Sequence, residues 1–63
     1  MGSIMITLRK VSNDGWQLFA PKGHALSQVF RGEKHKAEEW ATAWISSFHN
    51  WTLKVEDPNE KEN

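Results

Sequence analysis

The chain lacks cysteine and tyrosine, contains only two prolines, and has no excess of either charge among its 63 residues. The absence of cysteine excludes disulfide bonds, thiolate nucleophiles and cysteine-ligated zinc or iron–sulfur sites. A domain of about 60 residues buries only roughly 60% of the surface that its unfolded chain exposes. The short length therefore excludes a multidomain enzyme, and the fold must be stabilised by an apolar core or by self-association.

The sequence also lacks any apolar run close to the roughly 20 residues that a membrane span needs. No basic segment followed by an apolar run stands at the N-terminus, so no secretion signal is expected. We therefore expect a cytoplasmic protein without a membrane partner. Residues 1–3 are interpreted as a leader added for expression, residues 4–56 as a single domain, and residues 57–63 as a disordered acidic tail.

Basic and acidic residues are equal in number, eight of each, which argues against a general polyanion-binding protein. The charges are nevertheless segregated along the chain. Residues 1–36 contain six basic and two acidic residues, a net charge of +4, and residues 37–63 contain two basic and six acidic residues, a net charge of −4. The second half is therefore a candidate acidic surface for a partner protein, formed by a helix exterior and the tail.

Three segments show the alternation of apolar and polar residues that predicts a strand with one buried face. The first two are separated by Ser-Asn-Asp-Gly at residues 12–15, which predicts a tight hairpin turn. The segments are residues 4–9, 16–20 and 51–56, with inward rows of Ile4, Ile6 and Leu8, of Trp16 and Leu18, and of Trp51, Leu53 and Val55.

A further short strand is predicted over residues 26–31, after Pro21 and Gly23 end the second strand. The sequence does not decide which side of this strand faces the core. Either the side with Leu26 and Phe30 or the side with Val29 could point inward. We favour Leu26 and Phe30 as the inward residues on size.

From Glu33 to His49 the apolar residues recur at the spacing of an amphipathic helix. Only Gly32 is available as a cap at its start. Burial of one tryptophan side chain stabilises a fold by about 4–6 kcal/mol at 25 cal/mol per Å². We therefore interpret the tryptophans first as core residues. The helical stripe consists of Ala37, Trp40, Ala41, Trp44, Ile45 and Phe48, and Trp16 and Trp51 lie on strands.

The order of elements, strand-strand-strand-helix-strand, predicts a small single-domain α+β fold. We expect an antiparallel sheet with one amphipathic helix packed on one face. This order resembles that of the small domains of the HicB antitoxin type. The resemblance concerns element order over most of the chain, so it implies a fold and no function.

Residue patterns for catalysis and metal binding are weak. His24, His35 and His49 fall in a turn and at two helix ends, without the i, i+4 spacing of a helical zinc site. Glu38 and Glu39 are adjacent, which places them about 100° apart on a helix. The glycines are scattered at turns and form no phosphate-binding loop. We expect a protein that is not an enzyme and that has no cofactor and no metal.

The sheet face that the helix leaves uncovered is the remaining candidate site. Phe19 is the aromatic residue expected to be most exposed there. Apolar residues on this face suit a homodimer or another protein partner. The candidate interaction face consists of Met5, Thr7, Arg9, Gln17, Phe19, Arg31 and Lys54.

We consider two hypotheses for the function of this face. The favoured hypothesis is a protein-interaction or self-associating module, with a homodimer as the expected form and regulation of a larger host machine as its role. The alternative is binding of single-stranded nucleic acid, in which Phe19 stacks on a base and the basic residues follow phosphates.

Overall fold

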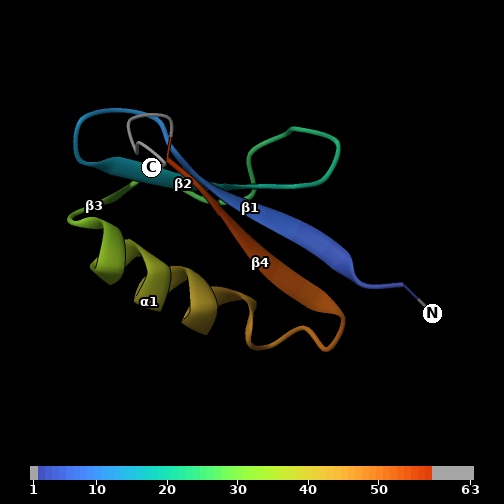
Figure 1. Cartoon of the computed structure of the whole chain (residues 1–63). Coiled ribbons are helices and arrows are strands. Elements are labelled where there is room, and N and C mark those ends of the chain that lie inside the picture. Colours follow the sequence, from blue (N-terminus) through green and yellow to red (C-terminus); the bar gives the residue numbers. More distant parts are fainter. Residues whose placement is uncertain (1, 58–63) are drawn as a thin grey trace, which may run out of the picture.

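The computed structural model describes residues 2–57, which form a four-stranded sheet with one helix packed on one of its faces (Figure 1). The predicted α+β fold and element order are confirmed. Met1 of the interpreted leader and residues 58–63 of the predicted tail lie outside the described residues. The elements are β1 (Ile4–Lys10), β2 (Gly15–Phe19), β3 (Phe30–Arg31), α1 (Lys34–Ile45) and β4 (Trp51–Glu56).

The sheet is mixed, with the strand order β3-β2-β1-β4. β1 pairs antiparallel with β2, and β2 with β3, but β4 pairs parallel with β1. The prediction of an antiparallel sheet is therefore wrong for β4. The reason is that α1 runs back across the sheet, so that β4 begins at the same end as β1 and runs in the same direction (Figure 1). Parallel strands need a crossover connection of this kind.

β3 is shorter than the strand predicted over residues 26–31, because side-chain hydrogen bonds replace part of the backbone ladder. The backbone N–H of Leu18 donates to the Ser27 hydroxyl at 3.2 Å. The side-chain amide of Gln17 donates to the Ser27 carbonyl at 2.7 Å. These two bonds hold the segment beside β2 without a regular strand.

The facing favoured for this segment is confirmed. Leu26 and Phe30 pack against the core, and Val29 is 43% exposed. The Phe30 ring also stacks on Trp40, with ring centroids 4.9 Å apart. This contact joins the β3 edge of the sheet to α1.

Gly32 connects β3 to the start of α1. Its φ of +153° lies in the region that favours glycine, and the N-cap is the next residue, Glu33, without a side-chain capping bond. The Gly32 carbonyl accepts the indole N–H of Trp16 at 3.1 Å. The connection therefore reverses the chain and also satisfies the polar atom of a buried tryptophan.

α1 ends at Ile45, before the predicted end at His49. The Ser46 hydroxyl donates to the carbonyl of Ala43 at 2.7 Å, and the Ser46 backbone N–H bonds the same carbonyl at 3.3 Å. Serine competes with the helical hydrogen-bond pattern in this way. Phe48 consequently lies beyond the helix instead of continuing its stripe, and it is 43% exposed.

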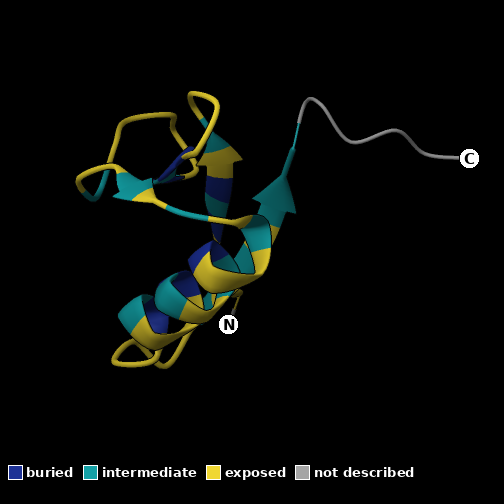
Figure 2. Ribbon diagram, turned by 90° about the vertical axis from the view of Figure 1, so that its left-hand side faces the viewer, coloured by how far each residue is buried: buried dark blue, intermediate teal, exposed yellow. Residues whose placement is uncertain are grey.

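The core lies between α1 and the inner face of the sheet. In Figure 2 the buried segments occur on the strands and on the helix, while most loops are exposed. Alanines on the inner side of α1 let the helix approach the sheet closely. The buried apolar residues are Ile6, Leu8, Trp16, Leu18, Ala37, Ala41 and Ile45.

The tryptophans differ in burial. Trp16 is 2% exposed, whereas Trp40, Trp44 and Trp51 are half-buried against the core. Trp44, Phe48 and Trp51 form an aromatic cluster, with ring centroids 3.9 Å apart for Phe48 and Trp51 and 6.4 Å apart for Trp44 and Trp51. The interpretation as core residues therefore holds fully for Trp16 and in part for the others.

Trp16→Ala is expected to remove much of the stability of the domain and to lower its melting temperature strongly. The substitution costs about 3–5 kcal/mol, and a chain of 63 residues has a free energy of unfolding of only about 3–9 kcal/mol. Thermal unfolding followed by far-UV circular dichroism measures the effect, with Val29→Ala as the control for an exposed apolar side chain. A cooperative melt of Trp16→Ala within a few degrees of the wild type would contradict the central place given to this residue.

Candidate functional site on the open sheet face

α1 lies on one side of the sheet (Figure 1), and we call the opposite face the open face. By the strand register, it carries side chains from β1, β2 and β4. The strand register aligns these side chains in rows that cross the three strands. All the predicted site residues except Arg31 belong to these rows. The rows are Gln17–Arg9–Glu56, Phe19–Thr7–Lys54 and Met5–Thr52.

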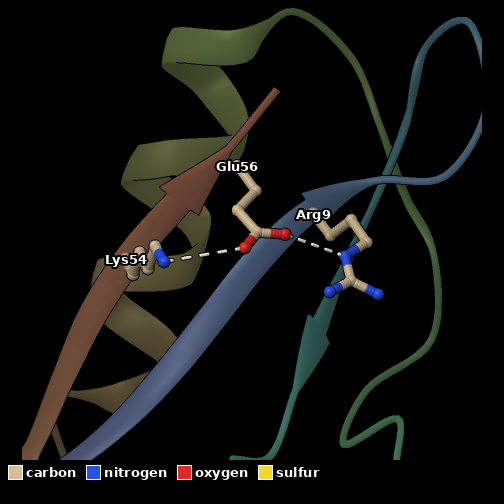
Figure 3. Close-up of polar contacts among 3 residues, drawn as sticks. All are labelled: Arg9, Lys54 and Glu56. Carbon is tan, nitrogen blue, oxygen red and sulfur yellow. Dashed lines mark hydrogen bonds and ion pairs between the residues drawn. The ribbon is translucent and has the colours of Figure 1, made fainter. Parts of the chain in front are cut away.

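Glu56 links the cations of the open face. Its carboxylate accepts Arg9 Nε at 3.0 Å through one oxygen and lies 3.7 Å from Lys54 Nζ through the other (Figure 3). Sequence reasoning did not include Glu56 in the candidate face, although the alternation of β4 places it in the same row as Thr52 and Lys54. The two basic residues therefore share one carboxylate, and the group of three keeps a net charge of +1.

Phe19 is half-buried, and the Arg9 guanidinium carbon lies 5.0 Å from the centroid of its ring. A cation over an aromatic face stabilises both side chains. Phe19 is an aromatic ring of the open face, as expected, but Arg9 shields it, and the more exposed Phe48 lies beyond α1 and away from this face. Arg9 thus bridges Glu56 on one side and Phe19 on the other.

Arg31 lies apart from the other candidate residues. It is on β3 and pairs with Gly15 in the register, at the far edge of the sheet from β4. Its guanidinium contacts the Asp14 carboxylate of the hairpin turn at 3.1 Å. Like Arg9 and Lys54, this cation has an acidic partner.

The other predicted residues of the open face are uncharged. Met5 is 45% exposed, while Thr7 and Gln17 are half-buried. The side-chain amide of Gln17 is held by the Ser27 carbonyl. Met5 is therefore the principal exposed apolar side chain on the open face.

The exterior of α1 carries balanced charge. Lys34 and Lys36 accompany Glu38 and Glu39 on the helix, and His35 Nδ1 lies 3.4 Å from Glu33 Oε1. A shallow depression of about 570 Å³ lies along this surface, lined by His35, Glu38, Glu39, Thr42, Ala43 and Ser46. The sequence led us to expect an acidic helix exterior. On α1 itself, however, the charges of the two glutamates are balanced by those of the two lysines.

A second hollow, of about 310 Å³, lies between α1 and the segment before β3. Sequence reasoning missed it, because the helical stripe assigned both of its tryptophans to the core. Trp40 and Trp44 are four residues apart, and this spacing predicts that they lie next to each other on one side of the helix. The lining residues are Ser27, Gln28, Val29, Phe30, Trp40 and Trp44.

Within residues 2–57, no group of three or more histidine, aspartate or glutamate side chains is placed to hold a metal ion. No helix in this part of the chain is long and apolar enough to cross a membrane. Comparisons with protein-family models, curated proteins and solved structures gave no match to the chain.

Glu56→Gln is expected to create weak binding of single-stranded DNA, because it removes the carboxylate shared by Arg9 and Lys54. Exposed ion pairs contribute only about 0–1 kcal/mol, so the fold should persist. Fluorescence anisotropy with a labelled oligothymidylate at low salt should show affinity several-fold above that of the wild type, and lost at high salt. Glu39→Gln, with the same charge change on α1, is the matched control. An equal gain in both variants would show that net charge, and not Glu56, is responsible.

Proposed function

We propose that the chain is a small, non-catalytic protein-interaction module that binds a protein partner through its open face. The observation that carries this proposal is the Arg9–Glu56–Lys54 arrangement, in which one carboxylate of the chain itself engages both cations of the face. The proposed location is the cytoplasm, and the proposed role is regulation of a larger machine by binding alone.

The same arrangement disfavours nucleic acid as the partner. A platform for single strands needs exposed rings for stacking and cations that are free to release counterions from phosphates. Phe19 is half-buried under Arg9, and Glu56 competes with a phosphate for both Arg9 and Lys54. A nucleic acid would have to displace these contacts before it gained new ones.

A protein surface fits the open face better. Protein interfaces are enriched in methionine, arginine and aromatic residues, with hydrogen-bonding groups at their margins. Met5 offers an exposed apolar side chain, with Thr52 beside it in the same row and Thr7 in the next row of β1. Because Arg9 and Lys54 both contact the Glu56 carboxylate, a partner can cover these charges with a smaller desolvation cost than it would need for isolated ions.

Met5→Asp is expected to abolish partner binding while preserving the fold, because Met5 is exposed and the new charge would be desolvated in the interface. The measurement is capture of proteins from a nuclease-treated lysate of the source cells on the immobilised full chain, quantified by mass spectrometry at low and high salt. Val29→Asp is the matched control, since Val29 is exposed to a similar extent on another part of the molecule.

The proposal requires that the protein is still captured after nuclease treatment and at high salt. The captured amount should fall at least about tenfold with Met5→Asp and should be unchanged with Val29→Asp. Capture that nuclease removes would identify a nucleic-acid-binding protein instead. Capture that Met5→Asp leaves intact would show that the open face is not the binding surface.

A further inference from the structure

β4 is a long strand at an edge of the sheet. It has six residues, Trp51–Glu56, and in the described part of the chain it pairs with another strand only through β1. The opposite edge differs, because β3 has only two residues. β4 contains no proline, glycine or irregular residue that would interrupt an added strand. Its outer edge is therefore a regular template for backbone pairing.

The backbone groups that point outward can be assigned from the pairing with β1. The Ile4 N–H donates to the Asn50 carbonyl at 2.7 Å, so Asn50 directs its carbonyl toward β1. Successive residues of a parallel ladder direct their backbone groups to alternate sides. The N–H and carbonyl groups of Trp51, Leu53 and Val55 consequently point toward the outer edge.

The same three residues carry the inner row of β4, and their side chains are only half-buried. The inner rows of β1 and β2, in contrast, contain fully buried residues such as Leu8 and Leu18. Among residues 2–57, the core is thus incompletely covered at the outer edge of β4, where no described strand pairs with the backbone. An added strand at this edge would complete both the hydrogen bonds and the apolar burial.

We propose that β4 pairs antiparallel with β4 of a second copy of this chain, about a two-fold axis at Leu53, to form a continuous eight-stranded sheet. Leu53 then lies opposite Leu53 of the second copy, and Trp51 lies opposite Val55 of the second copy. On the open-face side, Thr52 lies opposite Lys54 of the second copy. The outward backbone groups form about six hydrogen bonds in this register.

The charges and side-chain facing select this register. A slip of one residue would place open-face residues opposite inner-face residues. An axis at Lys54 would bring the two Lys54 side chains opposite each other, and like charges directly opposite are destabilising. An axis at Val55 would place Leu53 opposite Asp57 and leave Trp51 without a partner in the described strand. Only the axis at Leu53 pairs all three inner-row residues with apolar residues.

The interface is small. Protein interfaces contain about one hydrogen bond per 100–200 Å², so about six bonds correspond to roughly 600–1,200 Å². Interfaces below about 1,200 Å² are typical of weak complexes. We therefore expect a dimer with a micromolar or weaker Kd, whose two open faces lie side by side. This dimer uses the edge of β4, so it does not rest on the protein partner proposed for the open face.

Thr52 provides the test, because it is exposed and faces Lys54 of the second copy on both sides of the axis. Thr52→Glu creates two Glu–Lys pairs and should lower the dimer Kd, while Thr52→Lys creates two Lys–Lys pairs and should raise it. Each change is expected to be roughly 2- to 30-fold for the two symmetric pairs. Sedimentation equilibrium of the full chain from micromolar to millimolar concentration measures the Kd, and circular dichroism verifies that each variant is folded.

Gln28→Glu and Gln28→Lys, exposed near the opposite edge of the sheet, are the matched controls and should leave the Kd unchanged. A chain that stays monomeric at millimolar concentration would overturn the proposal. A lower dimer Kd for Thr52→Lys would overturn the proposal too. That result would mean that residue 52 lies opposite Glu56 of the second copy, as it does when the two-fold axis is at Lys54. A dimer that responds equally to the Thr52 and Gln28 substitutions would show that β4 is not the interface.

Discussion

The parallel pairing of β4 with β1 determines which side chains meet on both faces of the sheet. On the inner face it places Leu53 beside Ile6 and Val55 beside Leu8, where α1 packs. On the open face it places Glu56 beside Arg9. An antiparallel β4 would carry Glu56 toward the start of β1, where no cation stands, and would leave Arg9 without this carboxylate. The direction of one strand therefore sets both the closure of the core and the pairing of charges on the open face.

Residues 2–57 form one helix, and one helix covers only one face of the sheet. The other face must remain stable in water and still present a surface that can bind. Arg9 meets both requirements, because its guanidinium contacts Glu56 and covers Phe19. The resulting surface combines the Arg9–Glu56–Lys54 group with an exposed Met5 two rows from Arg9, which is the basis for proposing a protein partner.

Local patterns in the sequence predict most of the elements, because alternation and helical spacing depend on neighbouring residues. The inward positions of Ile6, Leu8, Trp16, Leu18, Ala37 and Ala41 follow from them. The predictions that failed concern contacts between residues far apart in the sequence. The direction of β4 depends on the path of α1, the short β3 depends on Ser27 bonding to β2, and the shielding of Phe19 depends on a register with β1. The alternation of residues 51–56 is sufficient to place Glu56 on the open face. Its contact with Arg9 could not be predicted without knowing how β4 pairs with β1.

Nuclear Overhauser contacts between β1 and β4 in the isotopically labelled chain test the central claim most directly. The parallel register requires backbone contacts between Ile4 and Trp51 at one end and between Leu8 and Val55 at the other. It also requires contacts between the side chains of Arg9 and Glu56. Contacts of Ile4 with Val55 and of Leu8 with Trp51 would show an antiparallel β4, and the account of the open face would then be wrong.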